Sequence, residues 1–160
     1  MRIVPVRRVA ILFATLFLLS LLPYSAMAQE QGSSQKADII IYVIEASNEG
    51  QGVDPQIQGL VKELGAFRYS SYKLVSKIPR QLRSGEKESV SLPGNRQMQL
   101  QMQGAEGNRV KLKVKITEKS EEQRSRDILN TEFRIIEGGT IMIGGYDYRN
   151  GKLFVAISAK

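Results

Sequence analysis

The sequence predicts an α+β fold in which a mostly antiparallel, curved sheet of about seven or eight strands carries one short amphipathic helix packed on one face. Three patterns predict this fold. Residues 38–46 form a β-branched run that is apolar on both faces, and residues 97–103 and 109–116 alternate strictly between polar and apolar side chains. Residues 55–64 space their apolar side chains as one face of a helix does.

The N-terminal residues have the layout of a secretory signal peptide. Arg2, Arg7 and Arg8 precede an apolar run over residues 9–22, and small residues lead to an expected cleavage site after Ala28. The run is shorter than a membrane span, and no span is expected in the exported chain. Cleavage lowers the net charge from +7 to +4, because it removes three arginines and no acidic residue. The predicted parts are a signal peptide (1–28), a flexible leader (29–36) and a single α+β domain (37–160).

The composition excludes most common catalytic devices. The chain has no cysteine, histidine or tryptophan, which removes the usual zinc sites, thiol chemistry and Ser-His-Asp triads. No metal and no cofactor are therefore expected, and a protein that is not an enzyme is favoured. The lack of a cysteine after the apolar run argues against a lipid anchor. The expected location is the periplasm, with an extracellular location as the alternative.

The first half of the domain is expected to open as strand, helix and strand. Residues 38–46 suit a central strand that is covered on both faces. Asp54 can cap a helix whose first residue is Pro55, and Gly65 lies where a left-handed C-terminal cap is usual. Residues 67–78 then have the composition of a strand. The helical face consists of Ile57, Leu60, Val61 and Leu64, and the strand is expected to end at Pro79.

The middle of the domain is expected to consist of short strands joined by tight turns. Gly85 is a turn candidate between strands at residues 81–84 and 86–92, and Pro93-Gly94-Asn95 is a strong turn signal. Glutamine alternates with apolar residues over 97–103, and a cation does so over 109–116. Such patterns predict strands with one buried and one solvated face. A hairpin through residues 104–108 is expected to join them.

The C-terminal segment is predicted to form a loop and three more strands. Residues 117–126 are charged and are expected to be a mobile loop, and residues 129–135 alternate as a strand does. Gly138-Gly139 is expected to reverse the chain, and Asn150-Gly151 to reverse it again before the closing strand. Gly144-Gly145, inside the returning strand, predicts a bulge. The expected strands after the first reversal are 140–148 and 153–159.

Residues 129–145, LNTEFRIIEGGTIMIGG, carry a resemblance to a known family. A strand leads into the acidic-Gly turn Glu137-Gly138, and a short β-branched strand ends in Gly144-Gly145. This block resembles a short stretch of secretins, the outer-membrane gate proteins of bacterial secretion and pilus systems. The longer pattern, with residues 67–74 (FRYSSYKL) after the helix, resembles a family of small exported bacterial proteins of unknown function. The secretin resemblance implies a role in an envelope system.

Two groups of residues are candidate binding sites. Phe67, Tyr69 and Tyr72 can form an aromatic platform for a sugar or a peptide, or they can close the core between helix and sheet. Three lysines and one arginine alternate along one face of a predicted strand. They can form a cationic stripe that binds a polyanion, or they can form an ordinary solvated face. The stripe consists of Arg109, Lys111, Lys113 and Lys115.

Two further groups are weaker candidates. The four glutamines of residues 97–103 form a hydrogen-bonding face that can add a partner strand, or a solvated face. A carboxylate pair is the one plausible catalytic device, and the candidates for it are Glu45, Glu63, Glu132, Glu137 and Asp147.

Together these patterns predict a small, soluble periplasmic binding protein that is an accessory or assembly factor of a secretion or pilus system. Its expected partner is an envelope protein. The alternatives are a carboxylate-dependent hydrolase of cell-wall glycan and a polyanion-binding module.

Overall fold

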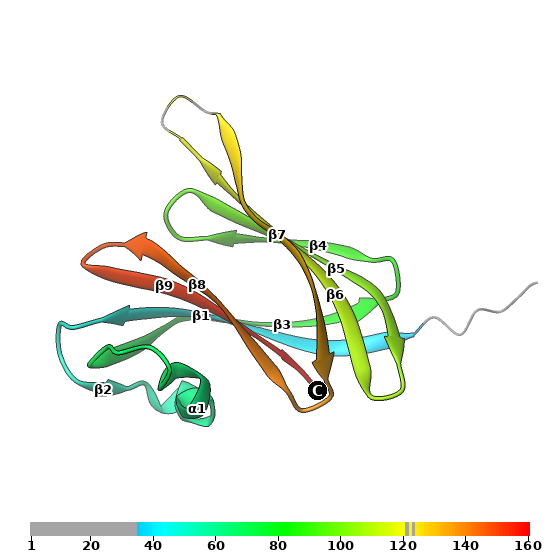
Figure 1. Ribbon diagram of the computed structural model, residues 1–160, viewed down its shortest axis with the longest axis horizontal. Coiled ribbons are helices and arrows are strands. Elements are labelled where there is room, and N and C mark those ends of the chain that lie inside the picture. Colours follow the sequence, from blue (N-terminus) through cyan, green and yellow to red (C-terminus); the bar gives the residue numbers. More distant parts are fainter. Residues whose placement is uncertain (1–34, 121, 123) are drawn as a thin grey trace, which may run out of the picture. The chain divides into compact units, whose positions relative to one another are not determined.

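The computed structural model describes residues 35–120, 122 and 124–160 (Figure 1), all of which belong to one compact unit. The predicted signal peptide, its cleavage after Ala28 and the predicted leader up to residue 34 lie outside the described residues. The first strand begins at Lys36, one residue before the expected start of the domain. Gln35 precedes it, and its side-chain oxygen accepts a hydrogen bond from the amide of Ala105 at 2.7 Å.

The described chain is rich in β-structure, as predicted, but it forms two sheets where one was expected. Sheet A has the order β2-β3-β1-β9-β8 and sheet B the order β4-β5-β6-β7, and all neighbours are antiparallel except β2 and β3. The strands are β1 (Lys36–Ser47), β2 (Gly52–Val53), β3 (Ser71–Arg83), β4 (Lys87–Leu92), β5 (Arg96–Glu106), β6 (Arg109–Lys119), β7 (Ser125–Ile136), β8 (Thr140–Tyr148) and β9 (Gly151–Ala159).

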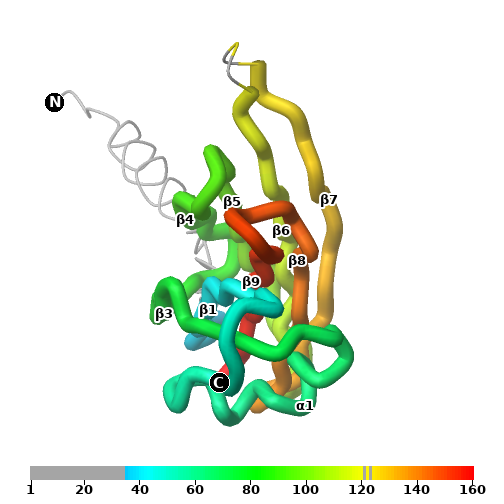
Figure 2. Tube along the Cα trace, turned by 90° about the vertical axis from the view of Figure 1, so that its left-hand side faces the viewer, coloured from blue at the N-terminus to red at the C-terminus, as the bar shows by residue number. Residues whose placement is uncertain are grey.

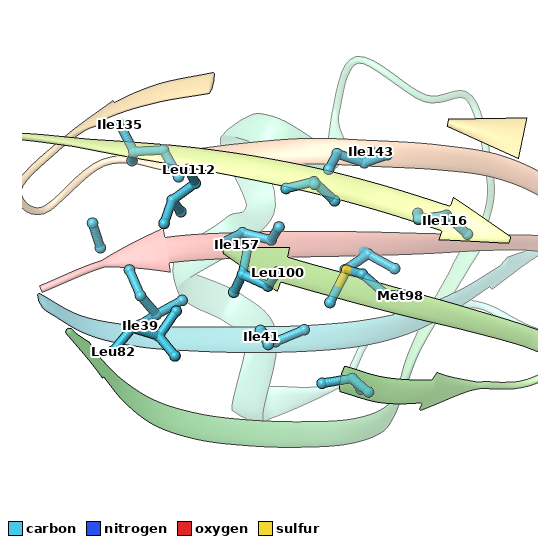
Figure 3. Packing of buried hydrophobic residues seen from close by; sticks show 14 of the residues in the cluster. Ile39, Ile41, Leu82, Met98, Leu100, Leu112, Ile116, Ile135, Ile143 and Ile157 are labelled. Carbon is cyan, nitrogen blue, oxygen red and sulfur yellow. The ribbon is translucent and has the colours of Figure 1, made fainter. Parts of the chain in front are cut away.

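The second sheet exists because the inner strands of sheet A are apolar on both faces. β1 lies between β3 and β9, as expected of a central strand, and each of its faces needs a cover. Sheet B covers one face, and Ile39 and Ile41 of β1 pack there with Leu100 of β5 and Leu112 of β6 (Figure 3). The strict alternation over residues 97–103 and 109–116 is confirmed, since the apolar side chains of β5 and β6 are buried in this core.

The other face of sheet A is covered by a short helical segment, the 3₁₀ helix η1 (Pro55–Leu60) followed by the single α-helical turn α1 (Val61–Leu64) (Figure 2). The Asp54 cap is confirmed, because its carboxylate accepts a hydrogen bond from the amide of Gln56 at 2.9 Å. The expected left-handed cap is wrong: Gly65 has a φ of −62°. Only short helical pieces form, and Ile57, Leu60 and Leu64 anchor them on the sheet. Val61, which was expected on the same face, is 42% exposed, because the 3₁₀ turns change the spacing of the face.

Two segments extend further as strands than the sequence predicted. β3 continues through Pro79, which pairs with Ile40. Proline is tolerated at a sheet edge because no donor is needed on the open side, and β2 covers only Ser71 and Tyr72 of β3. The loop expected at residues 117–126 is strand at both of its ends, over residues 117–119 and 125–126. β6 runs to Lys119 and β7 starts at Ser125, because pairing in a long hairpin continues beyond the apolar residues.

The predicted reversals are confirmed at Gly85 and at Pro93-Gly94-Asn95, but two others differ. Gly138-Gly139 does not make a hairpin, since it carries the chain from β7 in sheet B to β8 in sheet A. The turn between β8 and β9 is centred one residue earlier than expected, on Arg149 and Asn150, with φ of 50° at Arg149. Gly151 already belongs to β9 and pairs with Ser47.

Candidate binding surfaces

The outer face of sheet B brings together two predicted groups, the glutamines of β5 and the cationic stripe of β6. The strands pair directly, with Gln99 opposite Lys115 and Gln101 opposite Lys113. The predicted stripe of Arg109, Lys111, Lys113 and Lys115 lies on this face with exposed or half-buried side chains. The result is a continuous polar face without a covering element among the described residues.

The third strand of this face, β7, neutralises part of the stripe. Lys111 lies 3.1 Å from a carboxylate oxygen of Glu132, and Lys115 lies 3.0 Å from Asp127. Hydrogen bonds from Gln103 and Lys111 lower the pKa of Glu132, so this carboxylate stays charged. The face therefore carries mixed charges, and its field is weaker than the sequence of β6 alone indicates.

The predicted aromatic residues form one cluster on the outer face of sheet A, but they differ in exposure. The Tyr72 side chain is 6% exposed, and its hydroxyl contacts the carbonyls of Leu64, at 3.0 Å, and Phe67. Its role in the structure is to hold the loop after α1. Phe67 and Tyr69 are half-buried and pack on Phe154, with ring centroids 4.3 Å and 6.1 Å from it. Phe154 belongs to the same cluster, although it was not among the aromatic residues predicted from the sequence.

A pocket of about 560 Å³ opens beside this cluster, where β8 makes its bulge. The predicted bulge at Gly144-Gly145 is confirmed by a shift in the pairing of β8 with β9. Gly145 has a φ of 89°, and a Cβ built on it would meet no atom within 4 Å, so the space above it is empty. The pocket wall contains Phe67, Arg68, Tyr69, Lys152 and Phe154.

β8 also forms one edge of sheet A, and β9 is the one strand that pairs with it within the described residues. Edge strands normally carry charges or proline that prevent further pairing. At the other edge of sheet A, β2 is only two residues long, and the part of β3 that it leaves open has lysines and a proline. In sheet B, β7 has several charged residues and β4 is only six residues long. β8 has no charged residue and no proline from Thr140 to Tyr146. It is therefore the least protected edge that the structure describes.

Arg96, which is nearly buried, connects the C-terminal end of β8 to sheet B. The Arg96 side chain is 9% exposed, lies 2.6 Å from a carboxylate oxygen of Glu118 and donates to the carbonyl of Asp147 at 3.1 Å. Its guanidinium also lies over the ring of Tyr146, 5.5 Å from the centroid. Burial alone would raise the pKa of Glu118, but Arg96 and Arg126 outweigh it and lower that pKa. This contact fixes the position of β8.

Three of the five candidate catalytic carboxylates take part in ion pairs with cations. Glu45, Glu132 and Asp147 are each bound to a different cation, namely Arg149, Lys111 and Lys152. The hydrogen bond and charge of Lys152 lower the pKa of Asp147. A glycosidase needs a general acid whose pKa is raised, which is the opposite direction.

Comparisons with protein-family models, with curated proteins and with solved structures found no match. In residues 35–120, 122 and 124–160, no three acidic, histidine or cysteine side chains cluster as a metal site requires. None of the helices in these ranges is long and apolar enough to cross a bilayer.

Proposed function

We propose that this protein is an exported binding module that adds an extended segment of a partner protein to the open edge of β8. The observation that carries the proposal is the lack of protection on this edge, compared with the charged, short or proline-bearing edges elsewhere in the two sheets. Strand addition uses backbone hydrogen bonds for affinity, and the backbone of Thr140–Ile143 presents such groups in a regular stretch before the bulge.

The rigidity of β8 supports the proposal. β9 pairs along its whole length, the Arg96 contact holds one end, and Thr140 at the other end bonds to Ser158 through their hydroxyls at 2.6 Å. A partner strand would therefore meet a preformed edge and would not have to order it, which lowers the entropic cost of binding. We further propose that the partner is an envelope protein and that the module serves a secretion or pilus system in the periplasm. The support for this is the signal peptide that the sequence predicts, together with the resemblance to secretins.

Photo-crosslinking through methionine tests the proposal, because the chain offers an internal control. Met142 lies half-buried in the middle of the β8 edge, whereas Met98 and Met102 are fully buried in the core. Photo-methionine incorporated in expressing cells is expected to give a discrete adduct whose crosslinked peptide contains Met142. Met142→Leu should abolish this adduct without changing the fold. Strand addition at β8 would be contradicted if the Met142→Leu variant still formed the adduct. It would also be contradicted if no adduct of the original chain contained Met142.

A second candidate function is polyanion binding on the outer face of sheet B, which is favoured by the alignment of four cations on β6. The probe is fluorescent dextran sulfate, and its affinity should fall steeply as salt rises. Replacing Lys111, Lys113 and Lys115 by alanine should remove the salt dependence. Replacing Gln97, Gln99 and Gln101 by alanine is the matched control on the same face. Equal binding by both triple variants would exclude this site.

A further inference from the structure

We infer that the pocket at the Gly144-Gly145 bulge selects the partner segment by two features, a large apolar side chain and a carboxylate on the same face of its strand. This inference rests on the proposed function and specifies its partner. The occupant is an extended peptide segment that contains an aromatic or long aliphatic residue and an aspartate or glutamate. Its basis is the position of the pocket on the open edge and the charge of the pocket wall.

The position follows from strand geometry. A strand added to β8 would lie about 4.8 Å from it, and every second side chain would point to the outer face of sheet A. The pocket opens on that face, because Phe67, Tyr69 and Phe154 belong to the cluster that packs there. β8 itself contributes only the two glycines of the bulge to the wall. A side chain of the added strand can therefore reach over β8 without meeting a Cβ at Gly145.

The apolar part of the pocket consists of ring surfaces. Phe67 and Tyr69 are half-buried where they pack on Phe154, and all three residues line the pocket. Aromatic rings contribute large contact areas at binding sites, and they favour other rings and long aliphatic chains. One side chain of the segment is thereby anchored next to the edge.

The charged part of the wall is cationic. Arg68 and Lys152 are its charged members, and no carboxylate lines the pocket. Lys152 is paired with Asp147, whereas Arg68 is exposed and forms no ion pair with a described residue. A carboxylate that enters beside the anchored side chain would meet both cations and would form a bidentate pair with the guanidinium. Because residues i and i+2 of a strand share a face, the acidic residue is expected two positions from the apolar one.

Selection of a random peptide library by the purified protein tests the inference. The original chain should enrich peptides with an apolar residue and an acidic residue two positions apart. Arg68→Glu should remove the acidic preference and weaken binding of a selected peptide by about five- to tenfold, as expected for reversal of an exposed charge. Lys87→Glu is the matched control, because Lys87 is an exposed lysine on β4 in the other sheet. It should leave both the consensus and the affinity unchanged.

A second pair of variants distinguishes failure of the pocket from failure of the edge. Met142→Lys adds a charge to the open edge and should abolish binding, whereas Val75→Lys adds one to β3, between lysines that already protect that edge. Hydrogen exchange of the original chain provides a measurement that needs no variant, because bound peptide should protect amides of Thr140–Ile143.

The outcomes separate the two claims. If peptides bind through β8 but show no acidic preference, or if Arg68→Glu behaves like Lys87→Glu, the pocket inference is wrong and the edge proposal stands. If no peptide is enriched, or if Met142→Lys selects the same peptides as Val75→Lys without protection of β8, the proposed function itself is wrong. Concentration-dependent dimerisation that protects the same amides without peptide would instead identify a second copy of the chain as the occupant and would also overturn the inference.

Discussion

Three glycines around the β8–β9 hairpin allow backbone strain to be measured separately from steric exclusion. Gly145 has a φ of 89° but empty space where a Cβ would lie, so alanine there introduces strain alone. Gly151 has no positive φ, but its Cβ would lie 2.2 Å from the carbonyl oxygen of Ala46. Gly144 combines both features, with a φ of 142° and a Cβ position 2.5 Å from the carbonyl oxygen of Leu153. The three alanine substitutions should therefore form an ordered series.

The expected magnitudes follow from these distances and angles. Gly145→Ala should lower the free energy of unfolding by about 1–2 kcal/mol, the cost of a left-handed conformation. Gly151→Ala should cost about 1–3 kcal/mol or more, because a backbone carbonyl of the neighbouring strand has to move. Gly144→Ala should cost about 2–5 kcal/mol, the sum of both effects. The reduced freedom of the unfolded chain stabilises each variant by a similar amount, about 0.4–1 kcal/mol, and cancels in the comparison.

Urea denaturation followed by circular dichroism measures the series, with the slope m checked for constancy so that midpoints report stability. The reasoning is refuted if Gly145→Ala is as destabilising as Gly144→Ala, because the close contact of Gly144 would then contribute nothing. A Gly151→Ala variant as stable as the original chain would likewise show that β1 and β9 are not packed as closely as described. Met142→Leu serves as a nearby substitution that should change stability little.

Two further predictions concern the ends and faces of the strands. Glu118 has a folded-state pKa below its usual 4.5, so its ion pairs with Arg96 and Arg126 stabilise the fold above that pH and are lost as the pH falls through the lowered pKa. The stability difference between the original chain and Glu118→Gln should therefore shrink on acidification, and a difference that grows in urea titrations at decreasing pH would contradict this assignment. Leu112→Ala should cost about 2–5 kcal/mol by opening a cavity between the sheets, whereas Lys113→Ala should stay within about 0.5 kcal/mol. A similar decrease in the free energy of unfolding for both variants would show that the side chains of β6 do not alternate between core and solvent.

The elements that the sequence predicted well are those encoded by neighbouring residues. The alternation in β5 and β6, the Asp54 cap and the bulge at Gly144-Gly145 each depend on side chains a few positions apart, and all are present. The polar face that carries the lysine stripe was predictable for the same reason. Its neutralisation by Glu132 and Asp127 was not, because those residues come from β7, whose register against β6 no local pattern specifies.

The segments whose structure differs from the sequence-based prediction depend on contacts between distant residues. Gly138-Gly139 has the composition of a hairpin turn, yet the strands it joins lie in different sheets. Pro79 lies inside a strand because the adjacent edge of β3 is open at that point, which is a property of the sheet and not of the residues around the proline. The turn at Arg149 and Asn150 is displaced by one residue, and the close approach of β1 explains why Gly151 is needed within β9.

The amino-acid pattern was sufficient to determine that this domain is built from amphipathic strands around a central strand that is covered on both faces, because period-two hydrophobicity is a local property. The tertiary structure decided how those strands divide into two sheets and which edges stay open. β1 pairs with β9, the last strand of the chain, and this pairing leaves β8 at the edge beside the aromatic cluster. Strand order depends on how apolar faces far apart in the sequence are buried against one another, and the candidate binding edge is a consequence of that order.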